Sequence, residues 1–449
     1  MKRNLLFLMI LTFSLSSFSQ EKKVKTGWKF GGALPAVSFD SDLGFQYGAL
    51  FELHNYGDGS KSPDYIDRTY TEVSRYTKGS GIYRFMFESF HIIPGVHFTS
   101  DLSYLPDQAN NFYGYNGYES VFNKAWMDED DPAYRTRMFY RLERNQFRFK
   151  NDLDGNLSGK SLRWSAGFAF QNFKTGSVDI DKLNKGKDDK LPSVTEQPGL
   201  FERYKALGII PEDEAGGGWV NTIKAGLAWD SRDKRTNPMK GIWTEAGIEA
   251  APGFMGNDWS FSKFYITHRQ YFTIVENDLA FVYRINYQST LSGHTPFFYQ
   301  SQLITSLLTG ATSEGLGGFS SLRGVLKNRV IGDGFVFGNF EFRWKPVRFE
   351  LFNQDVYIGL NAFYDAGLVT DKIKLPAGIE TSFNSGIPIM GTDSFSDYFK
   401  PGKEKLHQSA GISIMPVLNE NFVVAIDIGK ALNEQDGNIG FSIGLNYLF

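Results

Sequence analysis

The residues whose types and spacing could form a specific interaction are one arginine and two acids in the second half of the chain. Arg323 and Gly324 belong to the glycine-rich stretch 317–325, and Glu341 and Asp365 follow it. A guanidinium presents a planar fork of N–H donors, which can bind carboxylates through several hydrogen bonds at once. The sequence therefore allows Arg323 to pair with Glu341, with Asp365 or with both.

The two acids occur in segments of alternating polarity, which predicts that both lie on strands. In 335–344 and 356–368, apolar side chains take every second position, and Glu341 and Asp365 fall on the opposite parity. Successive side chains of a strand point to opposite faces. Outward apolar faces would turn both acids to one interior, where a glycine-rich loop could bring Arg323. The alternative is that each acid lines a polar pore without binding Arg323.

The same alternation recurs along the chain and predicts an all-β fold. It is clearest in 45–53, 162–171, 279–288, 409–414, 422–429 and 441–449. A soluble sandwich and a transmembrane barrel both show this pattern. The polar faces carry many small residues and mixed charges, which suits a wet lumen and favours the barrel. The last segment supports this choice, because its aromatic residues lie toward the ends and its aliphatic residues in the middle.

The connections between these segments alternate between short and long. Short ones include 94–95, 156–160, 276–278 and 418–421, and long ones include about 107–134, 177–216, 289–332 and 370–406. Short turns on one side and long loops on the other are typical of outer-membrane barrels. We expect an antiparallel barrel of 16 strands, with about 27 residues for each strand and its connection.

Composition excludes several classes of protein. The chain has no cysteine, which rules out disulfides and thiolate metal sites. Its net charge of −3 argues against a nucleic-acid binder. After residue 20 no run of 18 apolar residues exists, so a helical membrane protein is excluded. The six histidines are scattered without metal-ligand spacing, and no catalytic motif stands out. We therefore expect no enzyme, metal or cofactor.

The N-terminus has the pattern of an export signal. Lys2 and Arg3 precede an apolar run, and Ser17 and Ser19 place small residues where signal peptidase reads them. The run is too short to span a bilayer as a helix. We expect a signal peptide over 1–19 and a single barrel domain over 20–449.

Three motifs together resemble a known family. The stretch Leu322-Arg323-Gly324-Val325 resembles the sixth external loop of the outer-membrane assembly-factor superfamily, the BamA- and TamA-like bacterial surface antigen barrels, although Val325 replaces the usual aromatic residue. Phe363-Tyr364-Asp365-Ala366-Gly367 is similar to the family's strand thirteen, and Glu341 matches its acidic position on strand twelve. Asp230, Arg232 and Asp233 resemble its periplasmic turn between strands eight and nine, although a purely structural turn explains them almost as well.

The resemblance covers 220–449 well and the first half more loosely, and it carries further expectations. It implies a glycine-rich external loop folded into the lumen, where Arg323 and Gly324 lock onto Glu341 and Asp365. It makes the last strand, with Tyr447 and Phe449, an assembly signal. The first strand is expected near Trp28, which leaves too few residues for the polypeptide-transport-associated (POTRA) domains that usually precede such barrels.

The implied function is help with the insertion or translocation of proteins or lipids at the outer membrane of a Gram-negative bacterium. The barrel would contact outer-membrane lipids and act with a separate periplasmic or outer-membrane protein partner. A passive channel or a structural surface barrel is the alternative.

Overall fold

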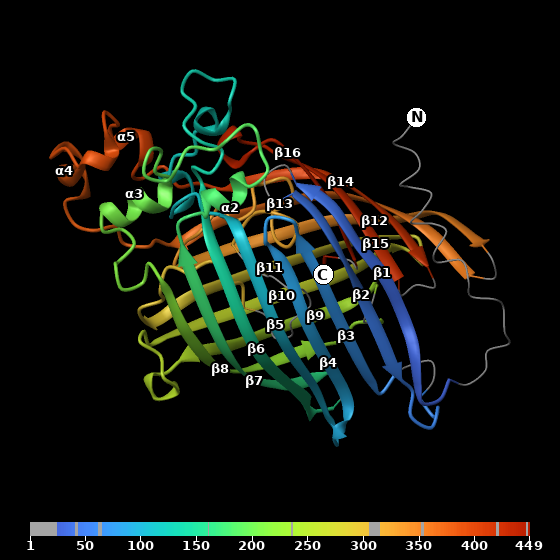
Figure 1. Ribbon diagram of the computed structural model, residues 1–449. Coiled ribbons are helices and arrows are strands. Elements are labelled where there is room, and N and C mark those ends of the chain that lie inside the picture. The colour runs from blue at the N-terminus through green and yellow to red at the C-terminus, as the bar shows by residue number, and fades with distance from the viewer. Residues whose placement is uncertain are drawn as a thin grey trace.

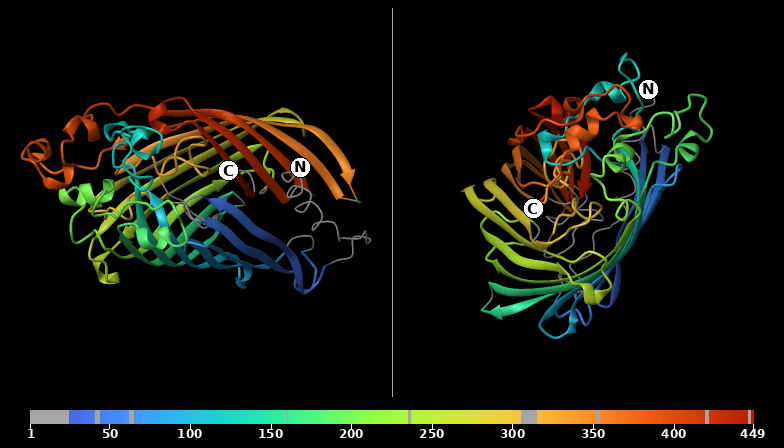
Figure 2. Two further views of the ribbon diagram at one scale, coloured as in Figure 1. Left: turned by 45° about the horizontal axis from the view of Figure 1, so that its top comes forward. Right: turned by 90° about the vertical axis from the view of Figure 1, so that its left-hand side faces the viewer.

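The computed structural model describes residues 25–449, apart from 41–43, 62–64, 160, 235–236, 305–314, 352–353, 419–421 and 446–447. The expected signal peptide and Tyr447 lie outside the described residues. The sequence alternation becomes one antiparallel sheet, in which each strand pairs with its neighbours in the chain. In the end-on view of Figure 2 this sheet curls round an interior.

The described residues form sixteen strands, the number expected from the sequence. They are β1 (Trp28–Asp40), β2 (Gly44–Asn55), β3 (Asp67–Tyr76), β4 (Gly81–Ile93), β5 (Val96–Asn111), β6 (Arg141–Ser158), β7 (Leu162–Gly176), β8 (Gly217–Asp230), β9 (Gly241–Ala251), β10 (Phe261–Val275), β11 (Leu279–Gly293), β12 (Gly334–Leu351), β13 (Gln354–Asp371), β14 (His407–Leu418), β15 (Phe422–Ala431) and β16 (Ile439–Leu445). Across these residues, no strand pair joins β1 to β16.

Alternation of side chains separates an apolar outer face from a polar inner face. On β12, Phe342 is 51% exposed and Trp344 is similarly exposed, whereas Glu341 between them is fully buried. Asn339 and Arg343 are buried with Glu341. The expected outward and inward parities are therefore both confirmed on this strand.

The long connections all leave the same end of the sheet, which we call the loop rim. We call the opposite end the turn rim. They run over 112–140, 177–216, 294–333 and 372–406, close to the expected ranges. Alternation of connection length is less regular in the first half, because the β3–β4 connection at the loop rim has only the residues 77–80.

The helical segments of the described residues are short and lie outside the sheet. The α-helices, which Figure 1 shows beyond the loop rim, are α2 (Ile180–Asn184), α3 (Leu200–Ala206), α4 (Ile379–Asn384) and α5 (Phe395–Tyr398). Single 3₁₀ turns are η1 (Gly117–Glu119), η2 (Lys124–Met127), η3 (Gly253–Met255), η4 (Pro388–Met390) and η5 (Glu434–Asp436). In the described part of the chain, no helix has the length and apolar character to cross a membrane.

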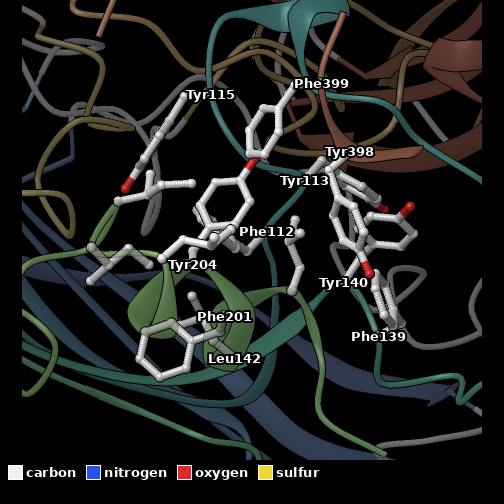
Figure 3. Packing of buried hydrophobic residues seen from close by; sticks show 14 of the residues in the cluster. Phe112, Tyr113, Tyr115, Phe139, Tyr140, Leu142, Phe201, Tyr204, Tyr398 and Phe399 are labelled. Carbon is white, nitrogen blue, oxygen red and sulfur yellow. The ribbon is translucent and has the colours of Figure 1, made fainter. Parts of the chain in front are cut away.

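Three of the long connections pack together into what we call the loop cap, formed by 112–140, 199–215 and 373–399. Its core is a cluster of buried aromatic and aliphatic side chains. Tyr204 of the β7–β8 connection lies 5.5 Å from Phe112 and 5.7 Å from Phe399, measured between ring centroids (Figure 3). At its edge Arg135 and Arg203 both donate hydrogen bonds to Asp393. These parts of the three connections therefore form one packed unit.

Candidate functional site: a loop locked to the inner wall

The β11–β12 connection places Arg323 inside the sheet. Its described part folds back on itself, with the N–H of Gly318 donating to the carbonyl of Val325 at 2.9 Å. Gly317 has a φ of +117°, and a Cβ there would lie 1.9 Å from the Leu326 carbonyl oxygen. Because only glycine tolerates that position, the glycine-rich pattern is what lets the loop turn tightly enough to present Arg323.

Arg323 binds both acids that the sequence singled out. Its backbone N–H and its Nε donate to Asp365 Oδ2 at 3.0 and 2.9 Å, and its Nη2 donates to Asp365 Oδ1 at 2.8 Å. Its Nη1 donates to Glu341 Oε1 at 2.6 Å. The guanidinium also lies over the ring of Phe363, 3.7 Å from the centroid. We call this arrangement of Arg323, Asp365 and Glu341 the lock.

The lock is buried, and its single cation faces two carboxylates. Arg323 is 2% exposed, and Glu341 and Asp365 are fully buried. Burial by itself would lower the pKa of Arg323, but the charges of Asp365 and Glu341 outweigh it and raise that pKa above its ordinary value. Arg323 therefore stays charged. Asp427 of β15 lies 3.7 Å from its Nη1 and adds to the negative field.

Apolar packing seats the loop around the lock. Leu322 and Val325 are buried on either side of Arg323 and Gly324. They belong to a cluster that includes Phe335 and Phe337 of β12 and Val369 of β13. Val325 is therefore buried in this cluster, although the family that the motif resembles usually has an aromatic residue there. Gly324 has a φ of +91°, which explains why the residue after Arg323 is glycine.

Arg329 is a second buried arginine of this loop that the sequence pattern did not identify. Its guanidinium donates to the carbonyls of Gly117, Ser120 and Gln435 at 3.1, 3.0 and 2.6 Å. Asp436 is 3.8 Å away. Three connections that are distant in sequence are thereby joined. The sequence marks Arg329 only by its position six residues after Arg323, and this spacing does not by itself predict a buried contact.

Asp230, the last residue of β8, lies at the turn rim with Arg232 and Asp233 of the β8–β9 connection, apart from the lock in sequence. Arg232 donates to both oxygens of Asp230 at 2.9 and 2.8 Å. Asp233 Oδ1 accepts the backbone N–H groups of Met239 and Lys240 at 3.1 and 3.3 Å. These contacts organise the turn itself, which agrees with the structural reading of this motif.

Phe449 does not continue the last strand as expected. β16 ends at Leu445, and the Phe449 carbonyl accepts a hydrogen bond from Arg343 Nη2 at 3.0 Å. Its ring lies 4.8 Å from the Arg343 guanidinium and 5.3 Å from that of Arg284. Inward arginines therefore hold this residue, where strand parity alone had placed its ring at the membrane interface. A role of Phe449 in assembly stays a prediction.

The histidines serve ion pairs and hydrogen bonds in the described residues. His97 bridges Glu88 and Asp154, and His407 contacts Asp436 at 2.7 Å. No group of three or more histidine, aspartate or glutamate side chains in these residues could hold a metal ion.

Comparison with known proteins agrees with this geometry. Residues 107–447 match the model of the Omp85 superfamily domain. The structure is similar to BamA from Haemophilus ducreyi lacking POTRA domains 1–3, with a TM-score of 0.50 and 13% identity over 93% of this chain and 70% of that chain. It is also similar to CdiB from Escherichia coli, with a TM-score of 0.53 and 10% identity over 95% of this chain and 62% of that one. No curated protein matches the sequence.

At such low identity the two structures show the fold alone, but the family match extends over most of the chain. The barrels of this family are outer-membrane proteins of Gram-negative bacteria. The expected resemblance to BamA-like barrels is confirmed. The chain belongs to the Omp85 superfamily.

Proposed function

We propose that this barrel assists the insertion or translocation of proteins or lipids at the outer membrane, with the lock holding its resting state. The observation that carries the proposal is the buried contact of Arg323 with Asp365 and Glu341. A loop that only covered a pore would not require a buried arginine bound to two separate strands. A bound state and a released state of one loop provide the two positions that a gated barrel needs.

The seam between the first and last strands supports an opening at that place. β1 has 13 residues and β16 has seven, and no pairing joins them in the part of the chain that the structure describes. Pro35 lies within β1, and a proline is tolerated at a sheet edge because it cannot complete a hydrogen-bond ladder. In the proposed mechanism these two strands part and a client enters the bilayer sideways. A separate protein that delivers the client is part of this proposal, as are export and cleavage after Ser19.

A passive channel is the second candidate, because charged side chains line the inner face. Arg84, Asp101 and Arg148, for example, form a buried network on β4, β5 and β6. The locked loop opposes this reading, because Arg323 is buried inside the sheet against β12 and β13. Conductance of single barrels in a planar bilayer separates the candidates, because a channel conducts steadily and a closed insertion barrel does not.

The direct test is a reconstituted insertion assay. The purified protein is placed in liposomes, an unfolded outer-membrane barrel is added, and its folding is followed by protection from protease. A lipid-scrambling assay in the same liposomes tests the lipid branch. We expect acceleration by the wild type and a reduced rate with Arg323→Ala. Arg348→Ala is the matched control, because Arg348 is an exposed arginine at the turn rim, paired with Asp278. Equal rates with and without the protein, together with no scrambling, would refute the proposal.

A further inference from the structure

The tip of the locked loop meets the last two strands at a close backbone contact, beside the approach of Arg323 to Asp427 of β15. A Cβ on Gly324 would lie 2.5 Å from the carbonyl carbon of Gly429 on β15. A Cβ on Gly440 of β16 would lie 3.0 Å from the Cα of Gly324. Gly429 and Gly440 are cross-strand partners. Three glycines from three segments therefore meet with no side chain between them, which is the closest approach that backbones can make.

The same loop also holds the connection between these two strands. The N–H of Leu326 donates to the Asp436 carbonyl at 2.8 Å, and Arg329 Nε donates to the Gln435 carbonyl at 2.6 Å. Residues 432–438 turn the chain from β15 into β16. The outer end of the last hairpin is consequently bound to the loop at several points.

A second connection runs from the lock to the residues beyond β16. Glu341 receives Arg323 on Oε1 and Arg343 Nε on Oε2, the latter at 2.7 Å. Arg343 in turn donates to the Phe449 carbonyl. One carboxylate thus joins the loop arginine to the arginine that holds Phe449.

The last strand has few other supports. β16 pairs with β15 through seven residue pairs, from Lys430–Ile439 to Val424–Leu445. Its other edge has no pairing partner in the described residues. Its outward side chains Ile439 and Phe441 are largely exposed. A short edge strand of this kind depends on contacts from its inner face for its position.

We propose that the Arg323 loop is the brace of the last strand. Arg323 fixes the loop to β12 through Glu341 and to β13 through Asp365. Gly324 packs directly against the backbone of Gly429 and Gly440. Glu341 and Arg343 hold Phe449, which lies beyond the last strand. Opening the lock therefore releases β16, the strand at the seam. This inference rests on the proposed function for its biological meaning, since it names what controls the seam, but its physical content does not require a client.

The test is amide hydrogen exchange, measured by mass spectrometry on the purified barrel in detergent micelles. Arg323→Ala removes the ion pairs to β12 and β13 and the 3.7 Å approach to Asp427 of β15, and it changes no residue of β16. We expect exchange in residues 439–445 to rise by about tenfold or more, because local opening of the strand becomes easier. Exchange in β5 to β8 should stay at the wild-type rate, which separates release of one strand from general loosening.

Two milder variants keep the test decisive if Arg323→Ala folds poorly. Gly440→Ala adds one methyl at a 3.0 Å contact and should raise exchange in both β16 and the loop around Gly324. Gly176→Ala on β7 is the matched control, because a Cβ there meets nothing within 4 Å. Arg343→Gln cuts the second connection without altering the loop, and it should raise exchange near Phe449.

The brace is refuted if Arg323→Ala and Gly440→Ala leave β16 at wild-type exchange while the loop itself exchanges faster. The outcome is independent of the insertion assay. Faster exchange in β16 of the variants, together with a wild type that neither accelerates client folding nor scrambles lipid, would retain the brace and reject the proposed function. The reverse result would retain the function and place its control elsewhere.

Discussion

Arg323 donates three hydrogen bonds to Asp365, from its backbone N–H, its Nε and its Nη2, and only one to Glu341. The two acids are therefore not equivalent. Asp365 has Arg323 as its bidentate partner, whereas Glu341 is shared between Arg323 and Arg343.

This asymmetry predicts the result of a double-mutant cycle. Arg323→Ala leaves buried acids without their cation and should lower the free energy of unfolding by about 3–5 kcal/mol, the usual cost of breaking a buried pair. The coupling energy with Asp365→Asn should reach about 2–3 kcal/mol. The coupling with Glu341→Gln should be smaller, because Arg343 still neutralises Glu341. Urea unfolding in lipid, read from gel mobility without heating, gives all three values.

Arg323→Lys should restore only part of the stability, because an ammonium cannot bind both carboxylates with a planar fork. Full rescue by lysine, or equal coupling to the two acids, would contradict this account of the geometry.

Arg329 should be as important for stability as Arg323, although no motif marks it. Arg329→Ala leaves the carbonyls of Gly117, Ser120 and Gln435 without their buried donor, and we expect a loss of about 3 kcal/mol or more. Limited proteolysis should cut 112–140 faster in this variant, because Arg329 holds Gly117 and Ser120 in place. An unchanged cleavage pattern would show that the aromatic cluster holds that connection alone.

The loop cap should loosen in acid through Asp393. Burial alone would raise the pKa of Asp393, but the hydrogen bonds of Arg135 and Tyr398 and the charges of Arg135 and Arg203 hold it below its ordinary value of 3.8. A lowered pKa in the folded state means that the stabilisation is complete above that value and is lost as the pH falls through the lower, folded one. The protection of α5 amides from exchange, corrected for the intrinsic exchange rate at each pH, should therefore fall below pH 3.8 in the wild type. Asp393→Asn should show fast exchange at neutral pH and little further change in acid.

Phe449→Ala should destabilise the folded barrel by about 1 kcal/mol, since it removes a ring that lies against two buried guanidiniums. Thermal unfolding of the purified protein measures this. Phe254→Ala is the control, because Phe254 is 84% exposed on the β9–β10 connection. A lower amount of barrel in the membrane with unchanged stability of the folded fraction would instead support the assembly role that the family resemblance implies.

The positions of Glu341 and Asp365 could be predicted from the sequence because strand parity is a local property. Once Phe342 and Trp344 are assigned to the outer face, Glu341 must point inward. The family motif then identified Arg323 as the partner. Local alternation is clearest in only six segments of the sequence, and the expected number of sixteen strands comes from dividing the chain length by the length of a strand with its connection.

Other contacts could not be predicted, because they join residues that no local rule connects. Arg329 meets Gly117 across 212 positions of sequence. Phe449 leaves the strand pattern because Arg343 and Arg284 attract it, and parity says nothing about such an attraction. The loop cap likewise depends on aromatic residues of three connections. The connection 112–140 is visibly rich in aromatic residues, but no local rule pairs them with 199–215 and 373–399.

The triad of Phe112, Tyr204 and Phe399 has a consequence for how this surface can change over evolutionary time. Its rings come from three different connections, so a change of size in one requires matching changes in the other two. Bacterial surface loops are usually free to diverge under attack by antibodies and phages. Here that freedom should be restricted to stretches outside the cluster, such as the mostly charged stretch 185–190. The aromatic positions should either be retained or change in concert.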